Sequence, residues 1–432
     1  MQYLKRKNSI SQKLDIRDYV SLIVIFYSLF ALNRIKSIWS PIIDGFKTTN
    51  EIWIYPLIFI IAIIFSKKKF RINKNTNVGI ILISFMIILV FLGAFKLESI
   101  DQFLYGSAIF LIPIIYLFIY KNGKNRDSII KWMIYFSIIY SILAIISSFN
   151  YASIMSFLGN IVNYQYYDLY RASLMLGSSI TVSYYLNISL PLIFFILYKK
   201  NTSRIEKLIY ITGILLNVIA TILLQSRLST LIMCIIIIYY IFFYDTKVSY
   251  KKIVSKVSIL SMVIIIIFIL FFEFNVDRLI MGFSDSSTKG RIEAMTLFTN
   301  IFKKNIFLGS GIGRYYTRIY SYRFIYYDGI TSLIDPHNMF ILMLSEIGIF
   351  GFVTYLLIII NALKRIIKTE DNEAKKTGCL LIFIIFMFSL GGSHLMNEIS
   401  FSIIVYIYLS VFINSESNRR YNVNENHVYR IS

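Results

Sequence analysis

Two arginines of this 432-residue chain lie where an anion could be bound. Arg227 directly follows Ser226, a residue type that favours helix N-caps, so Arg227 is predicted in the first turn of a helix. The helix dipole disfavours a cation there, and an anion held nearby would remove that penalty. Because a guanidinium group can bind phosphate with two prongs, we interpret Arg227 as a phosphate ligand, with packing or contact with lipid headgroups as the alternative.

The second arginine, Arg291, begins a predicted amphipathic helix that extends to Lys304. The apolar residues of this stretch recur at helical spacing, at Ile292, Met295, Phe298 and Phe302. Such a helix is expected to lie along the membrane surface with its polar side facing the site. Like Arg227, Arg291 is interpreted as a phosphate ligand, with packing or contact with lipid headgroups as the alternative.

A histidine follows in the segment Asp335-Pro336-His337-Asn338. Asp at an N-cap with Pro directly after it is a helix-start signature, which predicts His337 in the first turn. The dipole there disfavours the imidazolium form, so the ring should be neutral and able to accept a proton. We predict His337 as a general base and place Asn338 in or beside the substrate site, with capping or packing as the alternative for the histidine.

Further polar residues surround this segment. Glu346 lies in an apolar run, where an ionisable group is costly, but on an ideal helix it is half a turn away from His337 and about 13 Å deeper, so a supporting role is predicted. Arg314 and Arg318 belong to a tyrosine-rich stretch that suits either sugar binding or a membrane interface, and we assign both to the substrate site. Residues 309–313 resemble a phosphate cradle but lack its Lys, so a flexible turn is predicted.

The elements that must position these residues are membrane helices. Hydrophobic residues make up 57% of the chain and charged residues 16%, against roughly 45–50% and 25% in soluble domains. A spanning helix needs about 20 mostly apolar residues. Twelve such runs are found, at about 18–38, 50–66, 77–95, 101–120, 129–149, 175–198, 206–225, 228–244, 253–272, 337–361, 377–394 and 399–414. The predicted fold is an all-α, polytopic membrane protein.

The charges give the expected orientation. Of the 44 Lys and Arg residues, 30 fall in alternate segments between the runs, which the positive-inside rule places in the cytoplasm together with both termini. The predicted parts are helices 1–9 in residues 1–272, one large outer loop with amphipathic helices in 273–336, helices 10–12 in 337–414, and a cytoplasmic tail in 415–432.

The same composition argues against other partners and cofactors. The net charge of +21 is spread in short clusters between apolar runs and not over one polar face, so nucleic acid is not expected to bind. The two cysteines lie within apolar runs and the three histidines are far apart, so no disulfide, metal site or cofactor is predicted.

These residues together resemble the signature of the bacterial O-antigen ligase and polymerase family. Its elements are Gly309-Ser310-Gly311-Ile312-Gly313, a variable polar loop, Pro336-His337-Asn338, and Glu346-Ile347-Gly348-Ile349-Phe350-Gly351. Ser226-Arg227 and Gly290-Arg291 are similar to the family's arginines at the outer end of a span and on the loop helix, and Arg171 is a looser match. The resemblance covers about residues 220–355 and is architectural elsewhere.

The resemblance implies a polytopic glycosyltransferase of the bacterial inner membrane with one large periplasmic loop. An acceptor hydroxyl would attack the anomeric carbon of a sugar linked to undecaprenyl diphosphate, without a metal ion. Arg227, Arg291 and Arg171 would bind the diphosphate, and His337 would take the proton. The implied partners are the lipid-linked oligosaccharide as donor and acceptor, the lipid bilayer, and a protein that regulates chain length.

Three activities remain open. A polymerase joins lipid-linked repeat units of O-antigen or capsule, whereas a ligase transfers the polysaccharide to lipid A-core; the unusual tyrosine-rich loop favours the polymerase. A flippase would belong to a different class, the transporters. Transporters tend to show repeated halves and charged groups at mid-membrane, whereas the polar residues here gather at the outer boundary.

Overall fold

The described part of the chain is mainly helical. The computed structural model describes residues 16–29, 74–95, 106–107, 110–115, 117, 126–150, 174–176, 178–199, 202–243, 286–313, 324–327, 330–333, 336–397 and 399–413. Five helices are long and apolar enough to cross a membrane: α5 (Arg126–Phe149), α7 (Ser179–Leu197), α8 (Arg204–Leu223), α12 (Met339–Ile367) and α13 (Asn372–Gly391). Each of the five coincides with a predicted apolar run.

The remaining helices of the described part are shorter, less apolar or described only in part within their apolar run. They are α1 (Ile16–Leu29), α3 (Lys74–Ala94), the 3-10 turn η4 (Leu174–Leu176), α9 (Arg227–Ile238), the π-helix η5 (Tyr239–Phe243), α11 (Ser286–Lys304), α14 (His394–Asn397) and α15 (Ile399–Ile413). The predicted runs at 50–66 and 253–272 lie outside the described residues, and the run at 101–120 is described only in part. The count of about twelve spans therefore stays a prediction.

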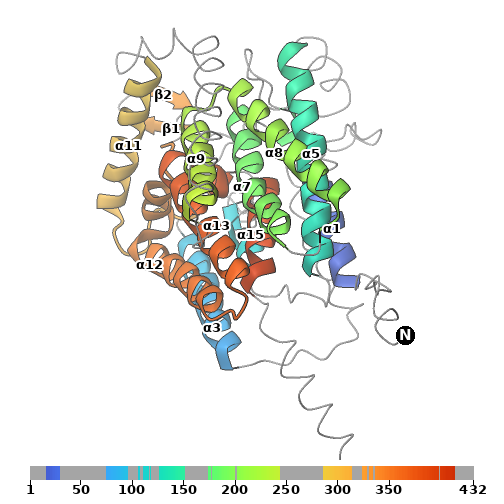
Figure 1. Ribbon diagram of the computed structural model, residues 1–432. Helices are drawn as coiled ribbons and strands as arrows, with labels where there is room; N and C mark the ends of the chain where they lie inside the picture. The colour runs from blue at the N-terminus through green and yellow to red at the C-terminus, as the bar shows by residue number, and fades with distance from the viewer. Residues whose placement is uncertain are drawn as a thin grey trace, which may run out of the picture.

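Helix α7 lies at the centre of the bundle. It packs against α5, α8, α9, α13 and α15, and Figure 1 shows it between α9 on one side and α5 on the other. Nearly all of its residues are buried, as expected for a helix that is apolar all round. The outer helices instead expose large apolar side chains, among them Ile81, Phe85, Leu208, Leu357 and Phe386. Faces of this kind fit a membrane environment.

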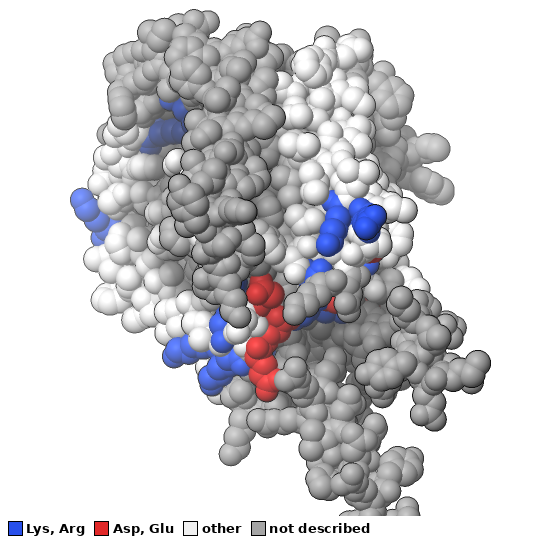
Figure 2. All heavy atoms as spheres, viewed as in Figure 1, with Lys and Arg blue, Asp and Glu red and all other residues white. Residues whose placement is uncertain are grey.

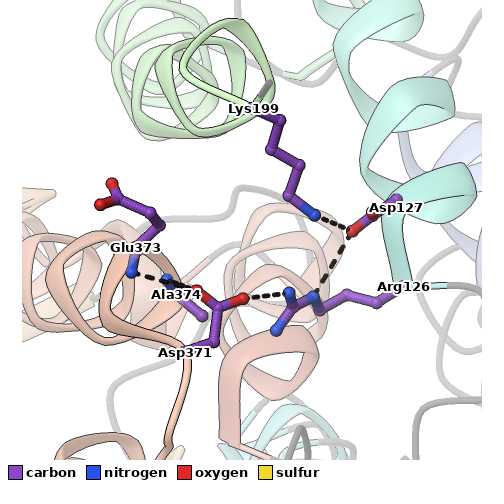
Figure 3. Close-up of polar contacts among 6 residues, drawn as sticks. All are labelled: Arg126, Asp127, Lys199, Asp371, Glu373 and Ala374. Atoms are coloured by element: carbon purple, nitrogen blue, oxygen red, sulfur yellow. Dashed lines mark hydrogen bonds and ion pairs between the residues drawn. The ribbon is translucent and has the colours of Figure 1, made fainter. Parts of the chain in front are cut away.

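The helices define two ends of the bundle. At one end α5 begins, α7 ends and α12 connects to α13; there Arg126 Nη2 lies 2.5 Å from Asp371 Oδ2, and Lys199 Nζ lies 2.5 Å from Asp127 Oδ1 (Figure 3). We call this the ion-pair end. Arg126, Lys199 and Asp371 lie between predicted apolar runs, in segments that the charge count places in the cytoplasm. At the opposite end α7, α9 and α12 begin and α13 ends.

A small hairpin departs from the all-α expectation. Strands β1 (Phe324–Tyr327) and β2 (Ile330–Leu333) pair antiparallel, with Phe324 opposite Leu333. The dipeptide between them in the sequence is Asp328-Gly329, the composition that two-residue hairpin turns favour. This signal was present in the sequence, within the predicted outer loop.

Candidate active site

The segment around His337 is folded differently from the sequence prediction. Helix α12 begins at Met339, and its N-cap is Asn338, whose Oδ1 accepts hydrogen bonds from the N–H groups of Phe340 (3.0 Å) and Ile341 (3.1 Å). Asp335 is therefore not the N-cap, and His337 lies one residue before the cap instead of in the first turn. Asn caps helices as well as Asp does, so the residue type at position 338 is compatible with this cap. The backbone of His337 has a φ of 47°, in the left-handed region that few residues other than glycine adopt.

Asn338 also connects α12 to another helix. Its Nδ2 donates a hydrogen bond to the carbonyl of Leu390 (3.2 Å), in the last turn of α13. The oxygen and the nitrogen of the Asn338 amide thus both bind backbone groups, and these bonds fix the position of the neighbouring His337. Direct contact of Asn338 with a substrate stays a prediction.

Arg227 occupies its predicted place. It is the first residue of α9, Ser226 is the N-cap, and the Arg227 side chain is exposed. The Ser226 side chain makes no capping hydrogen bond, so the cap rests on its backbone conformation. The next residue, Leu228, lies so close to Gly391 that any side chain at 391 would collide with it. The start of α9 and the start of α12 therefore both contact the end of α13.

Buried neutral groups attach α9 to the central helix. The hydroxyls of Ser183 and Ser229 lie 2.7 Å apart, and Asn187 Nδ2 donates to the carbonyl of Ser229 at 2.7 Å. All three residues are buried. This contact fixes the first turn of α9, and with it the base of Arg227, against α7.

Arg291 lies on α11, which packs along α12. The stripe that α11 buries consists of Ala294, Phe298 and Ile301, whereas Ile292 of the predicted stripe is exposed. This stripe packs against the helix bundle. The sequence had predicted that the apolar face would instead lie on the membrane surface. Arg291 itself is exposed, and its guanidinium is within electrostatic range of the Tyr184 hydroxyl on α7.

Unusual backbone conformations mark the same end of the bundle. Among the described residues, the non-glycine residues with positive φ are Leu174 (47°), Gln225 (54°) and His337 (47°). Gln225 and His337 each directly precede the N-cap of a helix, α9 and α12, and Leu174 opens η4 shortly before α7. Such conformations cost free energy and occur most often at functional sites. The strained residues therefore lie directly before α9 and α12, the helices whose starts carry Arg227 and His337.

Below this end, α12 is interrupted at Gly348. The φ of 67° and ψ of −172° belong to a region that only glycine adopts readily. A Cβ at this position would collide with the carbonyl of Phe307 and lie 2.5 Å from the nitrogen of Gly309. The glycine therefore permits both the break and the close approach of the chain that follows α11.

The chain after α11 satisfies the backbone groups that the break frees. The N–H groups of Ile349 and Phe350 donate to the carbonyls of Ile306 (2.8 Å) and Phe307 (3.4 Å), and those of Ser310 and Gly311 donate to the carbonyls of Ser345 (2.8 Å) and Glu346 (2.9 Å). In a membrane, irregular backbone is tolerated only where such groups find partners within the protein. Residues 305–313 and 345–350 therefore form one interlocked unit, which we call the glycine junction.

The glycine junction corrects one prediction and gives context to another. Residues 309–313 are buried and hydrogen-bonded, so they are neither a flexible turn nor a phosphate cradle with free N–H donors. Glu346 is fully buried, and its Oε2 accepts a hydrogen bond from the Gly313 N–H at 3.3 Å. That contact connects the carboxylate to the part of the predicted outer loop that follows α11; a role for Glu346 at the substrate stays a prediction.

The sequence of this region is similar to one known protein family. Residues 212–356 match the model of the O-antigen ligase family. The match confirms the resemblance to the O-antigen ligase and polymerase family, whose members are glycosyltransferase-like enzymes. It covers about a third of the chain. The matched part contains α9, α11, the hairpin and the first part of α12, including the break at Gly348. No curated protein matches the chain.

Three of the predicted site residues lie outside the described residues. They are Arg171, Arg314 and Arg318, and their assignment to the diphosphate and substrate sites stays a prediction. Within the described part, no group of three or more His, Cys, Asp or Glu residues is placed to hold a metal ion. The sequence prediction missed Tyr184 and the Ser183–Asn187–Ser229 contact, because polar residues inside an apolar run give no local sign of what they face.

Proposed function

We propose that this protein is an O-antigen or capsular polysaccharide polymerase, which joins undecaprenyl-diphosphate-linked repeat units on the outer face of the cytoplasmic membrane. The observation that carries the proposal is the convergence of helix starts at one end of the bundle. Contacts with the last turn of α13 bring the start of α9, with Arg227, close to the start of α12, with His337. Both termini of the protein would then lie in the cytoplasm.

The chemistry assigns one task to each side chain. A sugar hydroxyl of the acceptor attacks the anomeric carbon of the donor, and an imidazole nitrogen of His337 takes the hydroxyl proton. The bond from the anomeric carbon to the diphosphate oxygen breaks, and the lipid diphosphate leaves with the electron pair. Arg227 and Arg291 stabilise the negative charge that develops on that leaving group. A diphosphate is already a good leaving group, so no metal ion is required.

The exposed position of both arginines supports this assignment. A lipid diphosphate would reach them from the membrane boundary, and two guanidinium groups can together bind its several oxygens. Arg171 would add a third cation from the segment before η4. Arg314 and Arg318 would contact the sugars, together with the tyrosines of the same loop.

A ligase is the second candidate, because the matching family model carries that description. The polymerase and the ligase share the donor and differ in the acceptor. The tyrosine-rich stretch Arg314–Asp328 favours the polymerase, since aromatic rings with hydroxyl groups can select the sugars of one particular repeat unit. A protein that regulates chain length is a further expected partner of the polymerase.

One reconstitution separates these activities. Purified protein in detergent receives lipid-linked repeat units alone, or the same units with lipid A-core, in buffer that contains EDTA. The polymerase produces a ladder of longer lipid-linked chains from the repeat units alone. Product that appears only on lipid A-core identifies a ligase, and absence of any new glycosidic bond in either mixture contradicts the proposed enzyme class. Activity that requires added Mg²⁺ would contradict metal independence.

A further inference from the structure

Tyr184 lies at the meeting point of the helix ends described above. It belongs to the central helix α7, and its side chain is only 1% exposed. The ring stacks on Phe388 of α13, with centroids 3.8 Å apart and planes at 11°. Stacking fixes the ring, and the hydroxyl therefore has a defined position.

Contacts with the end of α13 show where that hydroxyl is. A Cβ placed on Gly391 would lie 3.7 Å from Tyr184 Oη, and the same Cβ would collide with Leu228, the residue after Arg227. The neighbouring carbonyl of Leu390 holds Asn338, the residue after His337. The phenol oxygen thus lies beside the one turn of α13 that contacts both of these helix starts.

Arg291 adds a cation to these surroundings from a fifth helix, α11. Its positive charge is part of the electrostatic surroundings of the Tyr184 hydroxyl. An anion held between Arg291 and the helix starts of α9 and α12 would meet a neutral hydrogen-bond donor as well as a cation. In a buried site, a hydrogen bond to a charged group is stronger than in water.

We propose that Tyr184 is a further ligand of the lipid diphosphate, donating a hydrogen bond from Oη to a phosphate oxygen that Arg291 also holds. This inference rests on the proposed function. It adds a neutral donor to a site so far built from cations and one histidine. A neutral donor stabilises the leaving group without adding a buried charge to the resting protein.

The adjacent tyrosine provides a matched control. Tyr185 is also fully buried on α7, but its hydroxyl lies 3.3 Å from that of Tyr408, and its ring packs edge-on against Tyr140. Phenylalanine at position 184 or at position 185 removes one hydroxyl and keeps the ring. The two substitutions therefore alter the buried packing to a similar extent. They differ in the hydroxyl that is lost, which lies beside the end of α13 at position 184 and beside Tyr408 at position 185.

The test compares Tyr184→Phe with Tyr185→Phe in the full-length purified protein, with lipid-linked repeat units as substrate. A lost hydrogen bond to a charged group is expected to lower kcat/KM about ten- to hundredfold in Tyr184→Phe. The same variant should be inhibited less by inorganic diphosphate, added as a probe of the anion site. Tyr185→Phe should resemble the wild type in both measurements, and both variants should melt at a similar temperature.

The outcomes distinguish this inference from the proposed function. Wild-type turnover and unchanged diphosphate inhibition in Tyr184→Phe would overturn the inference while leaving the enzyme assignment intact. Equal losses in the two variants would also overturn it, because they would indicate a packing role. Absence of glycosyl transfer by the wild-type protein itself would count against the proposed function.

Discussion

The two ends of the helix bundle use charge in different ways. At the ion-pair end, Arg126 and Asp371 join α5 to the start of α13, and Lys131 Nζ joins Glu206 at 2.5 Å between α5 and α8. At the opposite end, neutral groups also connect helices, as in the contacts of Asn338 with Leu390 and of Ser183 with Ser229. Charge therefore connects helices at one end, whereas at the other end the arginines Arg227 and Arg291 are exposed.

The surface agrees with this contrast. In Figure 2 the acidic side chains gather toward the lower end with Lys and Arg beside them, and most of the described surface above them is uncharged. Aromatic contacts add to the ion-pair end, where Arg126 and Lys199 both lie over the ring of Phe195, at 5.2 and 4.6 Å from its centroid. We infer that the ion-pair end is structural and that the opposite end carries the chemistry.

The strongest way to break this comparison is to replace arginine by lysine at each end. Arg227→Lys and Arg291→Lys keep the charge but lose the planar fork, and each is expected to reduce polymer formation about a hundredfold or more. Arg126→Lys should retain activity, because a lysine can still pair with Asp371. The measurement is initial rate with purified protein at matched amounts. Full polymer from Arg227→Lys, or inactive Arg126→Lys, would reverse the roles assigned to the two ends.

A smaller but still large effect is expected at the glycine junction. Gly348→Ala forces a side chain into a backbone region that costs about 1–3 kcal/mol, and its Cβ meets the Phe307 carbonyl. We expect a lower melting temperature and reduced activity, since the half-helix that follows His337 would be displaced. Gly290→Ala is the matched control, because a Cβ there meets nothing within 4 Å. If Gly348→Ala melts like Gly290→Ala, the junction does not hold the two segments together.

The smallest expected effect concerns acid stability at the ion-pair end. Burial raises the pKa of Asp371, but hydrogen bonds from Arg126 and from the Ala374 N–H outweigh this, so the pKa lies below its ordinary value. The resulting stabilisation is complete above about pH 4, the ordinary Asp pKa, and is lost as the pH falls through the lowered folded-state value. A partly exposed ion pair contributes at most about 1 kcal/mol.

Melting curves between pH 3 and pH 7 measure this contribution. Asp371→Asn should melt below the wild type at neutral pH, and the difference should shrink in acid. A difference that is the same at both pH values would show that the carboxylate charge is not what stabilises this end.

The sequence predicted elements whose signals are local. The apolar runs marked the long helices, and Ser226 marked the start of α9, because hydrophobic length and N-cap preference act within one segment. At α12 the pattern Asp335-Pro336 predicted a cap at Asp335, whereas the structure caps the helix with Asn338, whose amide also holds the carbonyl of Leu390 on α13. The sequence pattern alone placed the cap three residues too early, because it carries no information about the contact with α13.

The glycine junction shows why the rest of the site was not predictable. Gly348 reads as a tolerated glycine within a helix, and Gly309 reads as a turn residue. Their conformations depend on one another, because the carbonyls freed at the break accept hydrogen bonds from the turn that lies some 35 residues earlier in the chain. Pairings at this sequence distance leave no periodic pattern.

The central claim, that His337 is the general base of a glycosyl transfer at the end opposite the ion pairs, is tested most directly by the steady-state kinetics of His337→Ala. A base acts on the acceptor proton, so kcat should fall roughly 10²–10⁴-fold while the KM for the lipid-linked donor stays close to the wild-type value. The protein level and the melting temperature should be unchanged. A His337→Ala protein that turns over at the wild-type rate would contradict the account.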